Sequence, residues 1–317
     1  MLPPLPSHLY SLAHLFHQIG PRAQLSSSLA RLDRGLARKK TKTSTAFIFI
    51  GKGSFSDQSK KDLGMDSFVD VPLPMDKLSL GALGEAGGSE AVNKNQSFVV
   101  LVSTGSFNPP TYMHLRMFEL AKDALKAQGY SVIGGYMSPA NDAYRKKDLL
   151  SATHRVQLCE LACKSSSFVM VDPWEAKQYG YQRTLTVLSR IKSSLCKTGL
   201  ASEESLKIML LCGSDLLESF SIPGFWMLDQ VRTICRDFGV VCIRREGRDI
   251  EKIISSNEIL NENMSNIISV DEIVPNQISA TRVRECIRRG LSIKYLTPDE
   301  VIDYIKDQKL YLKSNDD

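Results

Sequence analysis

The strongest constraint on this chain is an alternation of short apolar segments with amphipathic ones from about residue 96 onward. Apolar, β-branched or aromatic residues predict buried strands, and apolar residues at helical spacing predict helices between them. Strands are predicted at 98–102, 131–137, 168–171, 207–211 and 239–243, and helices at 114–127, 153–164, 183–195, 230–237, 281–289 and, with a capping box at Thr297, 297–307. This alternation predicts an α/β fold with a mainly parallel sheet and helices on both faces.

Ligands of such sheets bind beyond the carboxyl ends of the strands, near the point where the strand order reverses. The first predicted strand runs into GSFNPPTYMH, residues 105–114. Gly105 lets the backbone approach a ligand, and the helix that follows directs free N–H groups and a positive dipole end at the loop. With the imidazole of His114 these groups suit a phosphate. Taken alone, the segment is better explained as a tight turn whose histidine caps the helix.

A second segment, NQISATRVRECIRRG at 276–290, favours the phosphate interpretation. Ser279 and Thr281 precede a predicted helix, and we expect Arg282 and Arg284 in its first turn. Arginine opposes the helix dipole there, but a strongly anionic ligand would resolve that conflict, because a guanidinium group grips phosphate with two hydrogen bonds. Two helix N-termini with phosphate chemistry predict a polyphosphate held between them.

Charge and composition exclude several classes of protein. The net charge of +5 is concentrated in residues 1–64, and the nearly neutral remainder shows no basic face with interleaved aromatics, which argues against a nucleic-acid partner. No apolar stretch approaches the ~20 residues of a membrane span. The seven cysteines form no CxxC pair and there are five histidines, so we predict no protein-held metal cluster.

The first 64 residues are basic and rich in serine and arginine, unlike the rest of the chain. This composition resembles an organelle transit peptide. A disordered extension, or an upstream start codon that the cell does not use, explains it equally well. We assign 65–95 to a linker, because GALGEAGGSE at 81–90 is typical of flexible segments, and 96–317 to a catalytic domain.

Several motifs in order carry a family resemblance. GSFNPPTYMH resembles the GxFxPxHxxH motif of the nucleotidyltransferase superfamily, and ISATRVR at 278–284 resembles its ISSTxxR motif. Between them lie SPANDAYRKKDLL, VDPWEA, LLCGSDLLESF and CIRREG. Together they resemble the eukaryotic nicotinamide/nicotinate mononucleotide adenylyltransferases over roughly 97–311. There are two departures: Thr111 stands at the superfamily's first histidine, and Tyr181 stands where family members often stack a tryptophan on the pyridine ring.

The resemblance implies a Rossmann-like nucleotidyltransferase fold and an enzyme of NAD biosynthesis. Such an enzyme transfers the adenylyl group of ATP to nicotinamide or nicotinate mononucleotide, forming NAD or deamido-NAD and pyrophosphate. The attacking 5′-phosphate is already an anion, so positioning and charge stabilisation suffice, with Mg²⁺ on the phosphates. Two alternatives remain: another adenylyltransferase of the same superfamily, and a non-enzymatic nucleotide-binding chaperone or scaffold.

The resemblance also implies the site residues. The catalytic residues are His114 and Arg284. The predicted ATP-binding residues are Gly105, Ser106, Phe107, His114, Gly213, Asp215, Asn276, Ser279, Thr281, Arg282, Val283 and Arg284. The predicted mononucleotide-binding residues are Ser106, Lys146, Tyr181, Thr184, Phe225, Trp226 and Glu272. ATP and the mononucleotide are the expected partners, and the oligomeric state, a homo-oligomer included, stays open. We expect the protein in the cytoplasm, the nucleus or both, or in an organelle if the N-terminal extension directs import.

Overall fold

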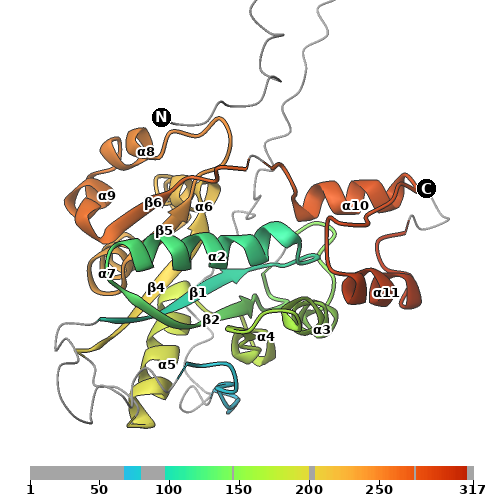
Figure 1. Cartoon of the computed structure of the whole chain (residues 1–317), viewed down its shortest axis with the longest axis horizontal. Coiled ribbons are helices and arrows are strands. Elements are labelled where there is room, and N and C mark those ends of the chain that lie inside the picture. The colour runs from blue at the N-terminus through green and yellow to red at the C-terminus, as the bar shows by residue number, and fades with distance from the viewer. Residues whose placement is uncertain (1–67, 80–96, 145, 200–203, 275, 313–317) are drawn as a thin grey trace, which may run out of the picture. The chain divides into compact units, whose positions relative to one another are not determined.

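The centre of the molecule is a six-stranded parallel sheet (Figure 1). The computed structural model describes residues 68–79, 97–144, 146–199, 204–274 and 276–312. Within them the strand order is β3-β2-β1-β4-β5-β6. The strands are Phe98–Gly105 (β1), Ser131–Pro139 (β2), Val169–Val171 (β3), Leu206–Gly213 (β4), Val240–Ile243 (β5) and Ile267–Val270 (β6). Every neighbouring pair is parallel, which confirms the predicted fold class.

Both faces of the sheet are buried, which explains why its strands are apolar almost throughout. Successive β1 side chains point to opposite faces. Val100 and Val102 therefore enter one core cluster, and Val99 and Leu101 enter another.

Two long helices cover the Val99 and Leu101 face. These are Tyr112–Ala127 (α2), which crosses in front of the sheet in Figure 1, and Ala152–Cys163 (α3). Ala280–Arg288 (α10) and Asp299–Asp307 (α11) pack against the outer side of α3, where Leu158, Val283 and Val301 share a third core cluster. The C-terminal part of the chain is thus brought beside the loops that follow β1 and β2.

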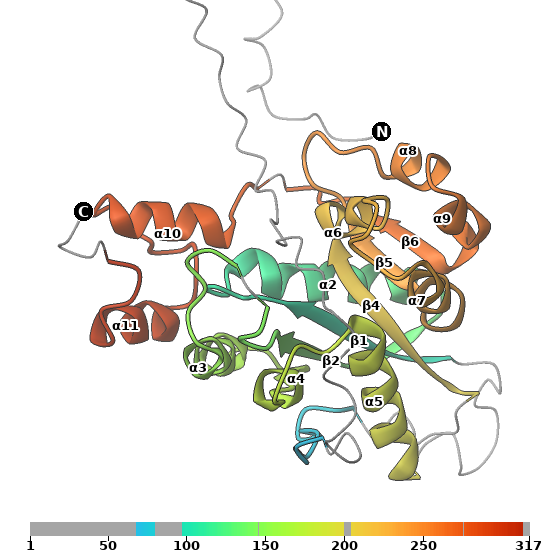
Figure 2. The ribbon, with the colours of Figure 1, turned by 180° about the vertical axis from the view of Figure 1, so that it is seen from behind.

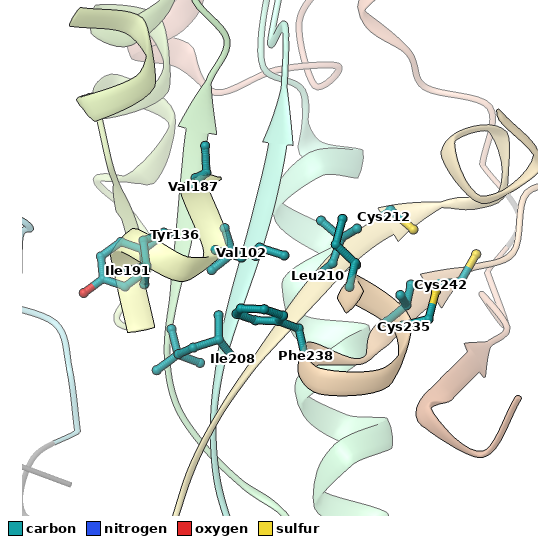
Figure 3. Packing of buried hydrophobic residues seen from close by; sticks show 14 of the residues in the cluster. Val102, Tyr136, Val187, Ile191, Ile208, Leu210, Cys212, Cys235, Phe238 and Cys242 are labelled. Atoms are coloured by element: carbon teal, nitrogen blue, oxygen red, sulfur yellow. The ribbon is translucent and has the colours of Figure 1, made fainter. Parts of the chain in front are cut away.

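The opposite face, nearer the viewer in Figure 2, is covered by the 14-residue helix α5 (Thr184–Lys197) and several shorter elements. Figure 3 shows Val187 and Ile191 from one of these helices beside Val102, Ile208 and other residues of the cluster. The elements in order are Trp174–Lys177 (α4), Thr184–Lys197 (α5), Ser214–Ser219 (α6), Leu228–Thr233 (α7), the π-helical turn Ile234–Phe238 (η2), Ile250–Ser255 (α8), Glu258–Glu262 (α9) and the 3-10 turn Met264–Asn266 (η3).

The structure corrects several predicted boundaries. The last helix begins at Asp299 and not at a capping box, because the Thr297 hydroxyl donates to the Pro110 carbonyl at 2.8 Å. The helix expected from residue 114 begins at Tyr112. Residues 68–79 pack into the core, so the linker assignment is wrong there. Residues 1–64 and the rest of the predicted linker lie outside the described residues.

Within the described part of the chain, none of the helices has both the length and the apolar character that crossing a membrane requires.

Candidate active site

The strand order reverses between β1 and β4. From β1 the chain adds β2 and β3 on one side of the sheet, and from β4 it adds β5 and β6 on the other side. This is the topological switch point at which open α/β sheets bind ligands. β1 ends at Gly105 and β4 ends at Gly213, so the two glycines predicted to contact ATP both lie at this edge.

Hydrogen bonds from distant parts of the chain hold the loop after β1. The fully buried guanidinium of Arg155 donates to the Ser106 carbonyl at 3.2 Å and to the Ala140 carbonyl at 2.7 Å. The Tyr311 hydroxyl donates to the Asn108 side chain at 2.8 Å. Arg155, Asn108 and Tyr311 were not among the predicted site residues.

The Phe107 ring, only 4% exposed, fills the space beneath this loop. Its centroid lies 5.3 Å from that of the His114 ring, in an edge-on arrangement. The side chain of Phe107 therefore supports the histidine, and its predicted role in ATP binding rests on its backbone.

Thr111 and His114 form a reciprocal unit at the start of α2. The Thr111 N–H donates to Nδ1 of His114 at 3.0 Å, and the Thr111 hydroxyl lies 2.8 Å from the same nitrogen. A nitrogen that accepts from a backbone N–H carries no proton, so the neutral ring has its proton on Nε2. Burial, and then the charge of Arg245, lower the pKa of His114 to about 4. The imidazole at neutral pH is therefore an uncharged donor.

Arg284 lies in the second turn of α10, and not in the first as predicted. Its Nη1 donates to the Asn108 carbonyl at 2.7 Å, whereas its Nε is buried and has no hydrogen-bond partner among the described residues. Burial, and then the charge of Arg284, lower the pKa of Lys146. Two partly desolvated cations close together repel each other, and an anion bound between them would relieve that repulsion. The pair therefore suits an anionic ligand.

The other predicted residues of α10 divide into two groups. Ser279 caps the helix by accepting from the Arg282 N–H at 3.3 Å, and Thr281 and Arg282 are exposed around this N-terminus. Val283 is fully buried in the cluster with α3. Its side chain therefore packs in the core and does not face the predicted ATP site.

Asp215 lies in the first turn of α6, two residues after Gly213, and is paired with a residue that the prediction did not include. The carboxylate accepts from Arg245 Nη1 at 2.5 Å. Arg245 also donates its backbone N–H to Ser214, and its charge acts on His114. The arginine follows β5, so two basic residues directly after a buried strand, in CIRREG, were the signal that could have found it.

The predicted pyridine side is more open. Tyr181 is 47% exposed, and its ring stacks on that of Tyr144 with centroids 6.0 Å apart. Thr184 is buried at the start of α5. Trp226 donates from Nε1 to Ser219 at 3.0 Å.

Different aromatic neighbours hold Tyr181 and Trp226, which are both predicted to bind the mononucleotide. Tyr181 stacks on Tyr144, whereas Trp226 packs edge-on against Phe220 with centroids 4.8 Å apart. The backbone of Phe225 is predicted to bind the pyridine amide, and its N–H already donates to the Ile222 carbonyl at 3.2 Å.

Glu272 and Asn276 lie along the outer side of α2. Glu272 pairs with Arg116 at 3.1 Å, and Asn276 contacts the sulfur of Met113 at 3.1 Å. Both line a cavity of about 500 Å³, whose lining in the described chain includes neither His114 nor any predicted pyridine-side residue other than Glu272. The structure thus groups Glu272 with Asn276 and not with Lys146 and Tyr181.

Among the described residues, no three or more His, Cys, Asp or Glu side chains lie together in a way that could hold a metal ion. We call the loop 105–114 together with Lys146 and Arg284 the phosphate corner. Its side-chain donors are the two cations and the His114 imidazole, and the helix α2 that begins there adds N–H groups. Such groups bind phosphate oxygens rather than a metal.

Known proteins place the chain in a family. The cytidylyltransferase-like family model matches residues 102–286. The nicotinamide/nicotinic acid mononucleotide adenylyltransferase of Oryza sativa subsp. japonica is 68% identical over 247 residues, which are 78% of this chain and 96% of that protein. The Arabidopsis thaliana enzyme of the same name is 62% identical over 243 residues, 77% of this chain and 98% of that protein. Adenylyltransferase 1 of Bos taurus is 40% identical over 260 residues, 71% of this chain and 92% of that protein. The chain belongs to the nicotinamide/nicotinic acid mononucleotide adenylyltransferase family.

Proposed function

We propose that this enzyme joins ATP to nicotinamide or nicotinate mononucleotide. The observation that supports this most directly is the buried Nε of Arg284, which has no hydrogen-bond partner among the described residues. The charge of the same arginine lowers the pKa of Lys146. A buried charged donor without a partner is costly, and a phosphate oxygen would satisfy it. The neutral donor of His114 lies at the same switch point.

In the proposed reaction a 5′-phosphate oxygen of the mononucleotide attacks the α-phosphorus of ATP. A new P–O bond forms, the bond to the bridging oxygen of the β-phosphate breaks, and pyrophosphate leaves with that electron pair. The nucleophile is an anion and needs no general base. His114 Nε2–H would donate to an α-phosphate oxygen as charge develops, and Arg284 would hold the polyphosphate.

A divalent cation, Mg²⁺ by preference, would arrive on the phosphates of ATP. The donor set at the corner fits this arrangement, because it offers N–H groups and cations for the remaining phosphate oxygens. Mg²⁺ bound to nucleotides commonly keeps several waters and takes few protein ligands. When bound it would neutralise phosphate charge, while His114, Lys146 and Arg284 position the two substrates.

Both mononucleotides should serve as acceptors. Thr184 carries a hydroxyl that can donate to a carboxylate or accept from an amide, so it suits either pyridine substituent. Tyr181 would stack on the ring, with less area than a tryptophan provides.

The test is an incubation of the purified protein with ATP, Mg²⁺ and each mononucleotide in turn, with pyrophosphate and dinucleotide both measured. With each acceptor we expect pyrophosphate and the dinucleotide to form in equal amounts. A folded protein that releases no pyrophosphate with either acceptor would refute the proposal and favour a nucleotide-binding scaffold. Pyrophosphate release with a different phosphorylated or acyl acceptor would identify another adenylyltransferase.

The cellular location is a separate proposal that depends on residues 1–64. If this segment acts as a transit peptide, we propose that the protein is imported into an organelle. If it does not, we propose that the protein is in the cytoplasm, the nucleus or both. Fusing residues 1–64 to a fluorescent reporter distinguishes the two. A reporter that enters no organelle excludes the transit function.

A further inference from the structure

The described N-terminal segment, residues 68–79, is a structural part of the molecule. Val71, Leu73 and Leu78 are buried in the core cluster that also contains α5. The Tyr136 hydroxyl donates to the Pro74 carbonyl at 2.7 Å, and the Ser79 N–H donates to the Ile133 carbonyl at 2.8 Å. Figure 2 shows this segment in blue, beside α4 and α5.

One end of the segment is tied to the chain just before Tyr181. The Val69 N–H donates to Gln178 Oε1 at 2.9 Å, and Gln178 Nε2 donates to the Val69 carbonyl at 3.1 Å. The same Nε2 donates to the Trp174 carbonyl at 2.9 Å. The Gln178 side chain, which is buried, therefore fastens α4 to the backbone of Val69 from both sides.

A second tie reaches the helix that begins at Thr184. Arg190, on α5, contacts both carboxylate oxygens of the fully buried Asp172 at 2.8 Å. These contacts are made by Nη1, and the other terminal nitrogen of Arg190, Nη2, donates to the Val71 carbonyl. The Arg190 guanidinium also lies 5.4 Å from the Trp174 ring, and the Phe68 ring packs on the same tryptophan with centroids 5.4 Å apart.

These contacts fix both ends of the segment that carries Tyr181 and Thr184. Asp172 and Gln178 precede Tyr181, and Arg190 lies in the helix that Thr184 begins. The phosphate corner is held by other groups, including Arg155 and Arg284. Loosening residues 68–79 would therefore let the pyridine side move while the corner keeps its geometry.

We propose that residues 68–79 form a positioning strap for the pyridine-ring subsite. The proposal rests on the proposed function for the identity of that subsite. The strap contacts the wall and not the substrate, so its loss should weaken binding of the mononucleotide. ATP binding and the chemical step should change little.

The test variant is Val69→Pro in the full chain, and the matched control is Val69→Ala. Proline has no N–H and removes the bond to Gln178, whereas alanine keeps both backbone groups. We expect Val69→Pro to raise KM for the mononucleotide about three- to tenfold, the value of one or two net hydrogen bonds, with KM for ATP and kcat close to wild type. Val69→Ala should leave all three constants nearly unchanged.

A second control separates positioning from general stability. Lys77 anchors the other end of the strap by donating to the Cys163 carbonyl at 2.7 Å and the Val169 carbonyl at 3.2 Å. Lys77→Met should lower the midpoint of thermal unfolding without a split between the two KM values. If Val69→Pro fails to fold, Gln178→Met replaces it in the comparison at similar side-chain volume. This substitution removes the bond from the Val69 N–H and also the two bonds that Gln178 Nε2 donates.

Equal rises of both KM values in Val69→Pro, or a wild-type KM for the mononucleotide in a folded variant, would overturn the proposal. Failure of the proposed function is recognised separately, because the wild-type protein would then form no dinucleotide. In that case amide hydrogen exchange over residues 178–184 decides. Faster exchange in Val69→Pro than in Val69→Ala supports the strap, and equal exchange rejects it.

Discussion

The two halves of the site differ in how far they are built before a ligand arrives. At the phosphate corner, Thr111 holds His114, and Asn108 holds Arg284 through hydrogen bonds of 3.0 and 2.7 Å. On the pyridine side, Tyr181 is 47% exposed and Trp226 rests on Phe220. Hydrogen bonds thus fix the side chains of the corner before a ligand arrives, whereas the Tyr181 ring is still half exposed to solvent.

The difference follows from what each half must recognise. Charge that develops on a phosphate is stabilised best by donors that do not reorganise during the reaction. A flat ring is recognised through buried area, which a movable aromatic side chain can supply once the ligand is present. We therefore expect changes at the corner to affect kcat and ATP, and changes on the pyridine side to affect the mononucleotide alone.

The largest effect should come from the donor itself. His114→Ala removes the Nε2–H that we propose donates to the transferring phosphoryl group, and should lower kcat by on the order of 10²–10³. His154→Ala is the matched control, because that histidine bonds to Tyr304 on α11. Single-turnover kinetics and circular dichroism on both variants check this. A folded His114→Ala variant within about tenfold of wild type, well short of one oxyanion-type donor, would reduce the histidine to a helix cap.

Arg284 should come next. Arg284→Ala removes the buried guanidinium and should raise KM for ATP roughly ten- to hundredfold, the value of hydrogen bonds to a charged group. Arg289, exposed at the end of α10, provides the control, and Arg289→Ala should do little. Steady-state kinetics with ATP varied measures both. Similar effects of the two substitutions would mean that α10 does not face the phosphates.

The preorganised histidine should also leave a mark on stability. The pKa of His114 is about 4 in the folded protein against an ordinary value of 6.5, so below pH 6.5 the unfolded chain takes up a proton that the native state refuses. Stability should therefore fall as the pH drops from about 6.5 toward 4. When the pH is lowered from 7 to 5.5, the free energy of unfolding of the wild type should fall by about 1 kcal/mol more than that of His114→Asn. Urea unfolding at both pH values tests this, and equal losses would place the imidazole in water.

The smallest effect should be on the open side. Tyr181→Ala should raise KM for the mononucleotide about fivefold, the value of one aromatic contact, and leave KM for ATP unchanged. Tyr181→Phe keeps the ring and should behave like wild type. Initial rates with each substrate varied distinguish the two. A loss in Tyr181→Phe as large as in Tyr181→Ala would assign the role to the hydroxyl and not to stacking.

Sequence patterns predicted the centre of the fold well. The predicted strands at 98–102 and 207–211 are present as β1 and β4, each somewhat longer than its apolar run. These strands are buried on both faces, so composition alone reveals them. β6 was missed, because this edge strand of four residues exposes Ser269 and leaves only a short apolar signal.

The parts that local patterns missed depend on contacts between distant residues. Arg155 lies on a correctly predicted helix, but nothing near it in the sequence shows that it turns inward to Ser106, 49 residues away. Tyr311 and Asn108 are 203 residues apart. The family resemblance supplied the candidate residues but not their partners, so the role of Thr111 in orienting His114 emerged only from the geometry.

The strap has a consequence for how the chain folds during synthesis. Val69 and Gln178 are separated by 109 residues, and Val71 and Arg190 by 119. The strap leaves the ribosome early and cannot dock until these partners have followed, because non-local contacts form only after the intervening chain is closed. All the residues to which the strap is hydrogen-bonded in the described structure have left the ribosome once residue 190 has emerged. This is before β4, which begins at Leu206, is available. The strap can therefore be fastened to the β1 to β3 half of the sheet while β4, β5 and β6 are still being translated.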